Sequence, residues 1–477
     1  MKWETVIGLE THIELSTKSK VFCSCGTKFG GEPNTNVCPV CLGHPGVLPS
    51  LNRQAVEFTV TAGLSLGCEI TPVSYMDRKH YFYPDLPKAF QTSQFHRPLC
   101  MGGSVTLTSG HVIRLNHIHL EEDAGKLVHE RGKTLVDYNR GGVPLMELVS
   151  EPDLRSADEA VEYMEQLQGI MRTAGVSDCR MQEGSMRCGV NVSIRPEGEE
   201  KLGTRAEVKN LNSFVSVRQA IEFEVARQIE LLENGGKVVQ ETRSFNAASG
   251  ETSSMRSKEN SDDYRYFREP DIVTVRITTS DIERLRSALP EMPQARAKRY
   301  TEQYSLSAAD AALLAKYRKV ADYYDATVAP PLSPLKEGGN RAKLSASFIL
   351  TQLFALISTE VAREEWKVPV TSEQLSELVT LTDSGKLSRD AAKRVFSKML
   401  ETGQSADSVM TSEGISTESV DVAALCKSAI DANPAAVEDY KNGKQKALQS
   451  LIGAVMKASK GQAPADAVRE RLAEMLK

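Results

Sequence analysis

The sequence predicts an α+β protein in which a strand-rich body precedes two helical parts. Before about residue 280, several segments alternate polar and apolar residues with the period of two that a half-buried strand requires. These segments are ETVIGLETHIEL, HVIRLNHIHL, RCGVNVSIRP and DIVTVRIT. From about residue 281 onward this alternation nearly disappears, and Ala, Leu, Lys and Glu dominate. The change of pattern along the chain therefore predicts the fold class.

Two stretches inside the strand-rich body have the apolar spacing of amphipathic helices. In SADEAVEYMEQLQGIMRTAG, Val161, Met164, Leu167 and Met171 recur at helical spacing, and Gly175 ends the segment. The second stretch, SVRQAIEFEVARQIELLENGG, ends on two glycines, which are common where a helix stops. We therefore expect two helices within the body.

Prolines and a capping pattern organise the helical remainder. Pro290 and Pro293 precede it, and the run PPLSP occupies residues 330–334. Thr371, followed three residues later by Gln374, resembles a capping box that opens a helix. We predict three domains, which are a strand-rich body at residues 1–290, a helical domain at 291–405 and a small helical tail at 406–477.

Bulk composition limits the class of protein. A chain of 477 residues is long enough for about three domains, and 40% apolar with 25% charged residues is ordinary for a globular protein. We find neither an apolar run long enough to cross a bilayer nor a signal-peptide core, so we expect a cytoplasmic protein without a membrane partner. The net charge of −5 means that a polyanionic partner would be bound by local basic patches.

Four of the nine cysteines are clustered, which indicates a metal site. Cys23 and Cys25 form one pair, and Cys38 and Cys41 form another across a loop rich in Gly and Pro. In a reducing compartment such pairs favour tetrahedral Zn²⁺. Four thiolates would fill its coordination sphere and leave no position for substrate, so the metal would be structural. The alternative is four unligated thiols, and the C-x-C spacing of the first pair is less common than C-x-x-C.

Carboxylates in three strand-like segments are candidate ligands of a cation. Alternation places Glu10, His12 and Glu14 on one face of the first strand, a set that suits a hard divalent cation or, alternatively, a solvated surface. Glu147 shares a face with apolar neighbours, where it would bind a metal or pair with an arginine at a strand edge. Glu122 belongs to an acidic run that is otherwise typical of a solvated turn.

Basic and amide side chains are candidate ligands of phosphate. Acidic ligands for a cation beside Arg and Lys donors would suit a nucleotide, and the candidates are Lys79, Lys88, Arg140, Arg187 and Asn191. The tail carries a lysine-rich helix that would either bind the phosphates of a folded RNA or simply be solvated. Its lysines are Lys441, Lys444, Lys446, Lys457 and Lys460.

Longer motifs resemble the family of B subunits of aspartyl/glutamyl-tRNA(Asn/Gln) amidotransferases. LVDYNRGGVPLMELVSEPD is similar to a signature of that family. The other motifs follow in the family's order, and they are VIGLETHIEL, CPVCLGHPGVLP, DRKHYFYPDLPKAFQTSQF, HLEEDAGKL, TRAEVKNLNSF and DDYRYFREPD. The resemblance extends over essentially the whole chain.

The resemblance implies a fold and a reaction. The fold would be a cradle with an antiparallel sheet like that of glutamine synthetase, then an all-α domain and a YqeY-like all-α tail that binds tRNA. The enzyme would be a glutamine-hydrolysing carbon–nitrogen ligase. ATP would phosphorylate the side-chain carboxylate of misacylated Glu-tRNA(Gln) or Asp-tRNA(Asn), and ammonia would then displace phosphate. The partners would be amidotransferase subunits A and C in a heterotrimer, and the first of them, an amidase, would supply the ammonia.

The resemblance also implies roles for residues of this chain. His12, Glu122 and Glu147 would bind Mg²⁺ at the catalytic site, Glu10 would bind a second metal, and Lys88 would lie near the ammonia exit. The four clustered cysteines match a zinc knuckle of some members. At Gly189 the family often has an Asp that helps the second metal, so Asn191 or water would have to substitute here.

Two other functions compete with this interpretation. A non-catalytic tRNA-binding scaffold would use the zinc knuckle and the lysine-rich tail, but it has no need of inward-facing acids. A zinc hydrolase is disfavoured because four cysteines close the metal site and no HExxH pair is present.

Overall fold

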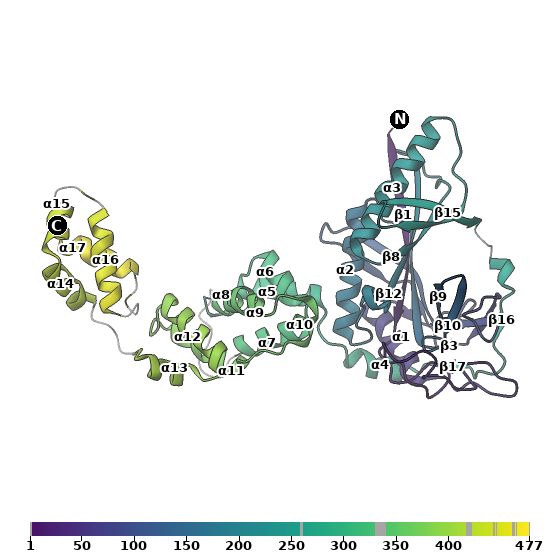
Figure 1. The fold of residues 1–477 in the computed structure, drawn as a ribbon, viewed down its shortest axis with the longest axis horizontal. Helices are drawn as coiled ribbons and strands as arrows, with labels where there is room; N and C mark the ends of the chain where they lie inside the picture. The colour runs from purple at the N-terminus through teal and green to yellow at the C-terminus, as the bar shows by residue number, and fades with distance from the viewer. Residues whose placement is uncertain are drawn as a thin grey trace. The chain divides into compact units, whose positions relative to one another are not determined.

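The computed structural model describes residues 2–257, 261–329, 340–415, 422–441, 444, 446–459, 463 and 465–476. The chain divides into two compact units, Met1–Met292 and Pro293–Lys477 (Figure 1). The first unit contains all the strands among the described residues, and the second is helical. The predicted combination of a strand-rich body with a helical C-terminal region is therefore confirmed.

A ten-stranded sheet forms the centre of the first unit (Figure 1). Its strands are hydrogen-bonded in the order β15-β14-β13-β12-β1-β11-β8-β6-β2, and β7 pairs with β8. The strands are β1 (Trp3–Glu14), β2 (Glu69–Ile70), β6 (Cys100–Met101), β7 (Ser104–Thr106), β8 (Val112–Glu122), β11 (Pro144–Ser150), β12 (Met186–Pro196), β13 (Ala206–Leu211), β14 (Glu241–Asn246) and β15 (Glu251–Ser257). The first strand of the chain thus lies in the interior of the sheet, between β12 and β11.

One pair of strands departs from the predicted antiparallel arrangement. β13 and β14 are parallel, whereas the other pairs of this sheet are antiparallel. Helix α3 (Phe214–Glu233) connects β13 to β14, and a strand–helix–strand connection returns the chain in the same direction. The sheet is therefore mixed.

The two faces of the sheet differ in chemistry, as the alternation in the sequence predicts. Ile7, Leu9 and Ile13 of β1 are at most 1% exposed and belong to the main hydrophobic core. The helices α1 (Arg53–Ser65), α2 (Ala157–Ala174), α3 and α4 (Thr279–Ser287) contribute to the same core. The even-numbered residues of β1 point to the opposite, polar face, so the candidate site is built on a rigid strand whose other face is buried.

The two predicted helices of the body begin and end within a few residues of the positions that the sequence indicates. The Ser156 side chain accepts a hydrogen bond from the Glu159 N–H at the start of α2. Gly175 ends α2 with φ 73°, a left-handed conformation that glycine adopts without steric cost. α3 begins after Ser213 in the same way, so both predicted helices of the body are confirmed.

Smaller strands complete the first unit. β9 (Lys126–Glu130) and β10 (Lys133–Asp137) form a hairpin that lies on the opposite side of the sheet from α2 (Figure 1). β16 (Phe267–Arg268), β4 (Asp77–His80) and β5 (Phe90–Ser93) form a three-stranded sheet, and β17 (Val275–Arg276) pairs with β3 (Val73–Ser74). These segments bring residues 77–97 and 264–269 close to the end of β8.

The second unit contains two separate hydrophobic cores. The first core includes residues of α5 (Pro293–Tyr304), α6 (Ala308–Ala315), α7 (Arg318–Val328), α8 (Asn340–Ser347), the π-helical turn Phe348–Leu353, α9 (Phe354–Leu356), α11 (Ser372–Asp383), α12 (Arg389–Thr402) and α13 (Ala406–Glu413), and α10 (Glu360–Glu365) lies among them in the chain. The second core includes residues of α14 (Val422–Ala432), α15 (Pro434–Lys441), α16 (Lys446–Ala458) and α17 (Ala465–Met475).

The predicted capping box is present at the start of α11, where Thr371 and Gln374 bond each other's backbone N–H groups. None of the described helices combines the length and the apolar composition that crossing a bilayer requires. The three-domain division, with boundaries after residues 290 and 405, stays a prediction, as does the cytoplasmic location.

Candidate active site

The polar face of the sheet carries a row of three side chains from neighbouring strands. His12 of β1 pairs with Glu147 of β11, and Glu147 pairs in turn with His119 of β8. Directly paired residues of antiparallel strands point to the same face. Glu147 Oε2 lies 3.6 Å from His12 Nε2 and 3.3 Å from His119 Nε2. The described residues thus give Glu147 two imidazole neighbours, whereas the simpler sequence interpretation expected an arginine.

A second carboxylate reaches this row from the end of β8. Glu121 lies two residues after His119 and therefore on the same face of the strand. Its carboxylate oxygens lie 3.7 Å from His12 Nε2 and 3.4 Å from His119 Nε2. His12, Glu121 and Glu147 place one ligand atom each within 4.8 Å of one another. One imidazole and two carboxylates are a donor set that fits a divalent cation.

The acid that joins His12 and Glu147 is therefore Glu121, and the sequence-predicted Glu122 lies elsewhere. The register between β8 and β11 is regular here, so adjacent residues point to opposite faces. Glu122 shares its face with Leu120, which is buried in the main core. In the predicted set of His12, Glu122 and Glu147, Glu121 therefore takes the place of Glu122.

Glu122 forms a separate contact with Lys88. Glu122 Oε1 accepts hydrogen bonds from the Lys88 Nζ and, at 2.8 Å, from the Thr92 N–H. The Lys88 Nζ also lies 4.9 Å from the centroid of the Phe90 ring. Lys88 and Glu122 line a cavity of about 170 Å³, which also borders Cys23 and Cys41. The predicted catalytic residues Lys88 and Glu122 are thus neighbours of each other, on the other side of β8 from His12.

The buried charges of the site are arranged to keep Glu147 ionised. Burial by itself would raise the pKa of Glu147, but the charges of His12 and His119 hold that pKa well below its usual range. Burial lowers the pKa of His119, whereas hydrogen bonds to Glu121 and Glu147 outweigh burial and raise it to about 10. At neutral pH an ionised carboxylate therefore faces the predicted metal position without first losing a proton.

His117 supports His119 from behind. The two imidazole rings stack with centroids 5.2 Å apart, and His117 Nε2 lies 3.2 Å from His119 Nδ1. Burial and the charge of His119 lower the pKa of His117 to about 4, so His117 is neutral and its Nε2 accepts the proton of His119 Nδ1. The sequence interpretation missed His117, His119 and Glu121, although the alternation in HIHLE places all three on one face.

His117, His119, Glu121 and Glu147 line a cavity of about 470 Å³, which we call the acid-lined cavity. Its residues are Thr71, Lys79, Ser93, Gln94, Phe95, His96, Arg97, Pro98, Met101, Asn116, His117, His119, Glu121, Glu147 and Tyr266. Lys79, predicted to bind a cofactor, is among them, and its Nζ lies 4.8 Å from the centroid of the Tyr264 ring. The cavity therefore combines carboxylates with cationic and aromatic groups.

The two arginines predicted to bind phosphate are held by a buried aspartate. Asp123 accepts a hydrogen bond from Arg187 and lies 3.5 Å from Arg140. Burial would raise the pKa of Asp123, but Arg187 and Arg140 lower it overall. Arg140 also donates to the backbone carbonyls of residues 124 and 125, at 3.0 Å and 2.9 Å. Both guanidinium groups thus already have protein partners.

Glu14 belongs to the same cluster as Asp123. Burial and the neighbouring Asp123 raise the pKa of Glu14 to about 8, so this acid is protonated near neutral pH. Glu14 therefore differs from Glu147, although both lie on the polar face. It is His12, between Glu10 and Glu14 in sequence, that reaches the metal-ligand cluster.

Glu10 forms a contact with Asn191. Asn191 Nδ2 donates to Glu10 Oε1 at 3.0 Å, and the buried Asn191 Oδ1 has no hydrogen-bond partner among the described residues. Gly189 lies opposite Glu10 in the register of β1 and β12 and supplies no side chain there. The role of Glu10 and Asn191 toward a second metal stays a prediction.

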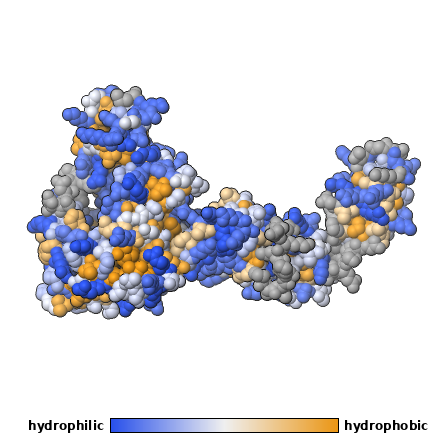
Figure 2. Space-filling model, turned by 180° about the vertical axis from the view of Figure 1, so that it is seen from behind, coloured by the Kyte–Doolittle hydropathy of each residue, from blue (hydrophilic) through white to orange (hydrophobic). Residues whose placement is uncertain are grey.

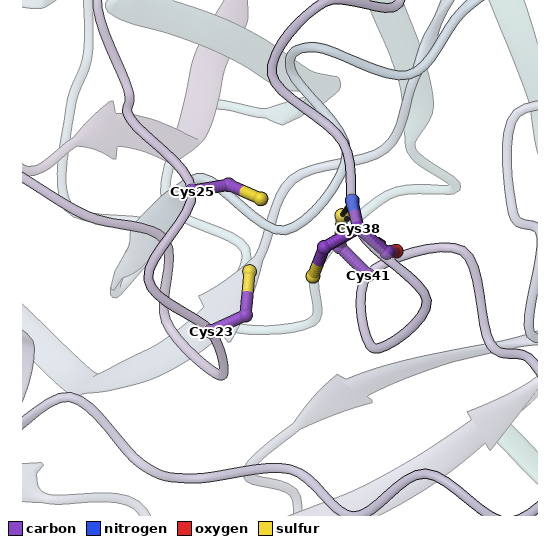
Figure 3. A group of neighbouring side chains, drawn as sticks. All are labelled: Cys23, Cys25, Cys38 and Cys41. Atoms are coloured by element: carbon purple, nitrogen blue, oxygen red, sulfur yellow. Dashed lines mark hydrogen bonds between the residues drawn. The ribbon is translucent and has the colours of Figure 1, made fainter.

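The four clustered cysteines face one another across two loop segments (Figure 3). The Cys38 N–H donates to Cys41 Sγ at 3.2 Å. The buried Lys20 Nζ lies 3.5 Å from Cys41 Sγ and donates at 3.1 Å to the backbone carbonyl of Tyr138. A hydrogen bond from Cys23 lowers the pKa of Cys41 to about 4. Four convergent sulfurs with a preferred thiolate fit a tetrahedral soft metal such as Zn²⁺.

The lysines of the tail lie on its surface. Lys441, Lys444, Lys446 and Lys457 are exposed, and Lys444 Nζ is 2.8 Å from an Asp439 carboxylate oxygen. Lys460 lies outside the described residues. Exposure is compatible with RNA binding and with simple solvation, so this role stays a prediction.

Comparison with known proteins gives consistent results over the whole chain. The family model described as the GatB/GatE catalytic domain matches residues 5–283, and the GatB domain model matches residues 333–476. A protein of Thermoanaerobacter pseudethanolicus is 48% identical over 482 residues, which cover 100% of each chain. A protein of Carboxydothermus hydrogenoformans is 45% identical over 485 residues, which cover 100% of this chain and 99% of the relative. Both relatives are named as B subunits of aspartyl/glutamyl-tRNA(Asn/Gln) amidotransferase.

Proposed function

The chain belongs to the GatB/GatE family of amidotransferase B subunits, and we propose that its acid-lined cavity is where ATP activates a carboxylate for amidation. The family assigns the chain to a glutamine-hydrolysing ligase that acts in translation. The substrates would be Glu-tRNA(Gln), Asp-tRNA(Asn) or both. The observation that carries the proposal is the cluster of His12, Glu121 and Glu147, of which Glu121 and Glu147 line this cavity.

The reaction needs activation because a carboxylate is a poor acyl donor to ammonia. In the proposed first step, the side-chain carboxylate of the aminoacyl group attacks the γ-phosphorus of ATP, and ADP leaves. In the second step, ammonia attacks the acyl carbon, phosphate leaves with the bonding electrons, and the nitrogen loses a proton. The product is Gln-tRNA(Gln) or Asn-tRNA(Asn).

The described residues have distinct tasks in this scheme. His12, Glu121 and Glu147 would hold Mg²⁺, which when bound neutralises charge on the phosphoryl oxygens. His119 contacts both carboxylates and orients them, and His117 accepts the second proton of His119. Because burial and fixed hydrogen bonds hold these groups in advance, little reorganisation would accompany the reaction.

Lys88 and Glu122 would act on the other side of β8. Lys88 would lie near the ammonia exit, as the resemblance implies, and it lines a different cavity from the acid-lined cavity. The Glu122 carboxylate would fix the position of the Lys88 ammonium. We further propose that Arg140, Lys79, Arg187 and Asn191 contribute to nucleotide binding, and that Glu10 binds a second metal.

The Cys cluster would hold structural Zn²⁺. Its loop is tied to the segment that precedes β11 by hydrogen bonds between Asn34 and residues 136–138 and between the Asn36 N–H and Asn139. Lys20 adds a further connection from Cys41 to Tyr138. The proposed role of the metal is therefore to hold the turn that precedes β11, the strand that carries Glu147. Four thiolates leave no coordination position for substrate.

The proposed partners are amidotransferase subunits A and C and the misacylated tRNA, in a heterotrimer. Figure 2 shows apolar residues gathered over the lower part of the first unit, and such patches are typical of protein interfaces. The lysines of the tail would contact tRNA phosphates. We also propose that the first unit has the glutamine-synthetase-like cradle fold and that the tail is a YqeY-like domain.

The proposed function can be tested in the complex reconstituted with its amidase and its third protein. We expect phosphate release from ATP that depends on Glu-tRNA(Gln) or Asp-tRNA(Asn), with free ammonia able to replace glutamine. The variant His12→Ala should lose this release while the glutaminase activity of the amidase persists. Wild-type rates in the variant would support the alternative, in which the chain is a tRNA-binding scaffold and the chemistry occurs elsewhere.

A further inference from the structure

An aromatic pair stands in the wall of the acid-lined cavity. The rings of Phe95 and Tyr266 stack with centroids 4.4 Å apart and planes inclined by only 12°. Both residues line the cavity that also contains Glu121 and Glu147. Phe95 is 50% exposed, so part of its ring is accessible to a ligand. The exposed ring therefore presents an apolar surface where the other cavity groups are largely polar.

The surrounding residues extend this surface and add positive charge. Tyr264 meets Tyr266 edge-on, with centroids 6.1 Å apart, and His96 meets Phe95 edge-on at 5.1 Å. We call Phe95, His96, Tyr264 and Tyr266 the aromatic shelf. The Lys79 Nζ lies over the Tyr264 ring, and Lys79 and Arg97 both line the cavity.

A buried aspartate fixes the position of the shelf. Asp77 is fully buried, and one of its oxygens accepts hydrogen bonds from the backbone N–H groups of Phe95 and His96 at 2.8 Å and 3.0 Å. Its other oxygen lies 3.0 Å from His96 Nδ1. These bonds fix the backbone at Phe95, and stacking on Tyr266 orients the ring. The exposed ring is thus placed for a ligand before that ligand binds.

Flat aromatic surfaces beside cationic side chains are the usual means by which proteins bind unpaired bases. Two nucleotide sources are available to this cavity under the proposed function, and they are ATP and the single-stranded 3′ end of the tRNA. The aminoacyl group is esterified to the terminal ribose, so a chain of about eight or nine bonds separates the reacting carboxyl carbon from the terminal base. When that carboxylate reaches Glu121 and Glu147, this chain is short enough for the terminal base to lie in the same cavity or at its rim.

We propose that the aromatic shelf stacks on the 3′-terminal base of the aminoacyl-tRNA and so positions the amino acid beside the metal ligands. This inference rests on the proposed function, because it requires an aminoacyl-tRNA substrate. Arg97, which also lines the cavity, neutralises a phosphate that precedes the terminal nucleoside. Phe95 is then a positioning residue, since stacking orients the substrate without touching the reacting atoms.

The kinetic test uses Phe95→Ala, Phe95→Trp and the control Phe82→Ala in the reconstituted heterotrimer. Phe82 is a suitable control because it is 78% exposed and does not line the cavity. We expect Phe95→Ala to raise the KM for aminoacyl-tRNA about tenfold, with the KM for ATP unchanged. In Phe95→Trp the KM for aminoacyl-tRNA should return most of the way to the wild-type value, and in Phe82→Ala it should equal that value.

A rise in the KM for ATP alone would mean that the shelf binds the nucleotide base and would overturn the proposal. So would an unchanged KM for aminoacyl-tRNA in Phe95→Ala. If the wild-type complex itself shows no aminoacyl-tRNA-dependent phosphate release, the proposed function fails instead. The two failures are therefore distinguishable.

A binding measurement gives an independent readout. In the Phe95→Trp complex, an RNA hairpin with an unpaired 3′ strand should quench fluorescence beyond the change seen with wild type. The same hairpin with a blunt end should not. Equal quenching by both hairpins, or by neither, would contradict stacking of a 3′-terminal base on the shelf.

Discussion

The two metal-ligand clusters of the first unit differ in their ligands and in the elements that carry them. His12, Glu121 and Glu147 lie on three adjacent strands of the main sheet, and they offer three ligands of mixed type, two of which line the acid-lined cavity. Cys23, Cys25, Cys38 and Cys41 lie on loops and offer four sulfurs. Three protein ligands leave coordination positions for a substrate, whereas four thiolates fill the tetrahedral sphere.

This difference separates a catalytic role from a structural one. Strands that are buried on their other face fix ligands with little freedom, which suits a site that must be correctly placed before the substrate arrives. Loops have few such restraints, so a metal that joins them contributes mainly to stability. Substitutions in the first cluster should therefore change rates, and substitutions in the second should change unfolding.

The largest effect is expected for Glu147→Gln. The amide keeps the size of the side chain but removes the charge that the two imidazoles hold ionised. Aminoacyl-tRNA-dependent amidation should fall by about 10²–10³-fold or more, as for loss of a group that stabilises transition-state charge. Thermal unfolding measured in parallel should still show a folded protein. Amidation near the wild-type rate would show that Glu147 has no role in catalysis.

The next effect distinguishes two adjacent acids. In Glu121→Gln the Mg²⁺ concentration for half-maximal activity should rise at least about tenfold, because a ligand is weakened. In Glu122→Gln that concentration should stay near the wild-type value, since Glu122 contacts Lys88 and lies outside the ligand cluster. Mg²⁺ titrations of the two variants check this directly. A rise in the required Mg²⁺ concentration in Glu122→Gln but not in Glu121→Gln would restore Glu122 as the predicted metal ligand.

The Cys cluster should affect stability more than rate. Cys38→Ser is expected to lose bound zinc and about 2 kcal/mol or more of unfolding free energy, which corresponds to a fall in Tm of about 4–8 °C. The matched control is Ser24→Ala, at an exposed position between two of the cysteines. Metal analysis with thermal unfolding measures both properties. Unchanged Tm after complete zinc loss would show that the loops do not need the metal.

The smallest effect concerns Glu14, whose pKa is raised to about 8 in the folded protein. An acid with a raised pKa binds more protons when folded, so it costs stability as the pH rises from its unfolded pKa of about 4.5 to about 8. Glu14→Gln removes this cost. Between pH 5 and pH 8, the free energy of unfolding of the variant should rise by about 1–3 kcal/mol relative to that of wild type, as measured by chemical denaturation. A difference that is independent of pH would show that Glu14 is ionised in the folded state.

Alternation in the sequence predicts most of the polar face of the sheet. The period of two in VIGLETHIEL places His12 opposite the buried face, and the same reasoning places Glu147 with Leu145 and Val149. Burial of one face imposes this pattern, because a shift by one residue would expose the core. The positions of His12 and Glu147 were therefore predictable before any coordinates were known.

Other features depend on contacts between distant segments and were not predictable. The choice between Glu121 and Glu122 depends on the register of β8 against β11, which a run of three acids does not reveal. The parallel pair β13–β14 depends on the path taken after α3. The aromatic shelf joins Phe95 to Tyr266, and no local pattern predicts that these segments meet.

The most direct test of the central claim is to locate a divalent cation in crystals of the protein soaked with Mn²⁺, using anomalous scattering. We predict a peak within about 2.0–2.3 Å of His12 Nε2 and of one carboxylate oxygen each of Glu121 and Glu147. A peak bound by Glu122 in place of Glu121, or no peak at this cluster while Mn²⁺ supports activity, would contradict the account.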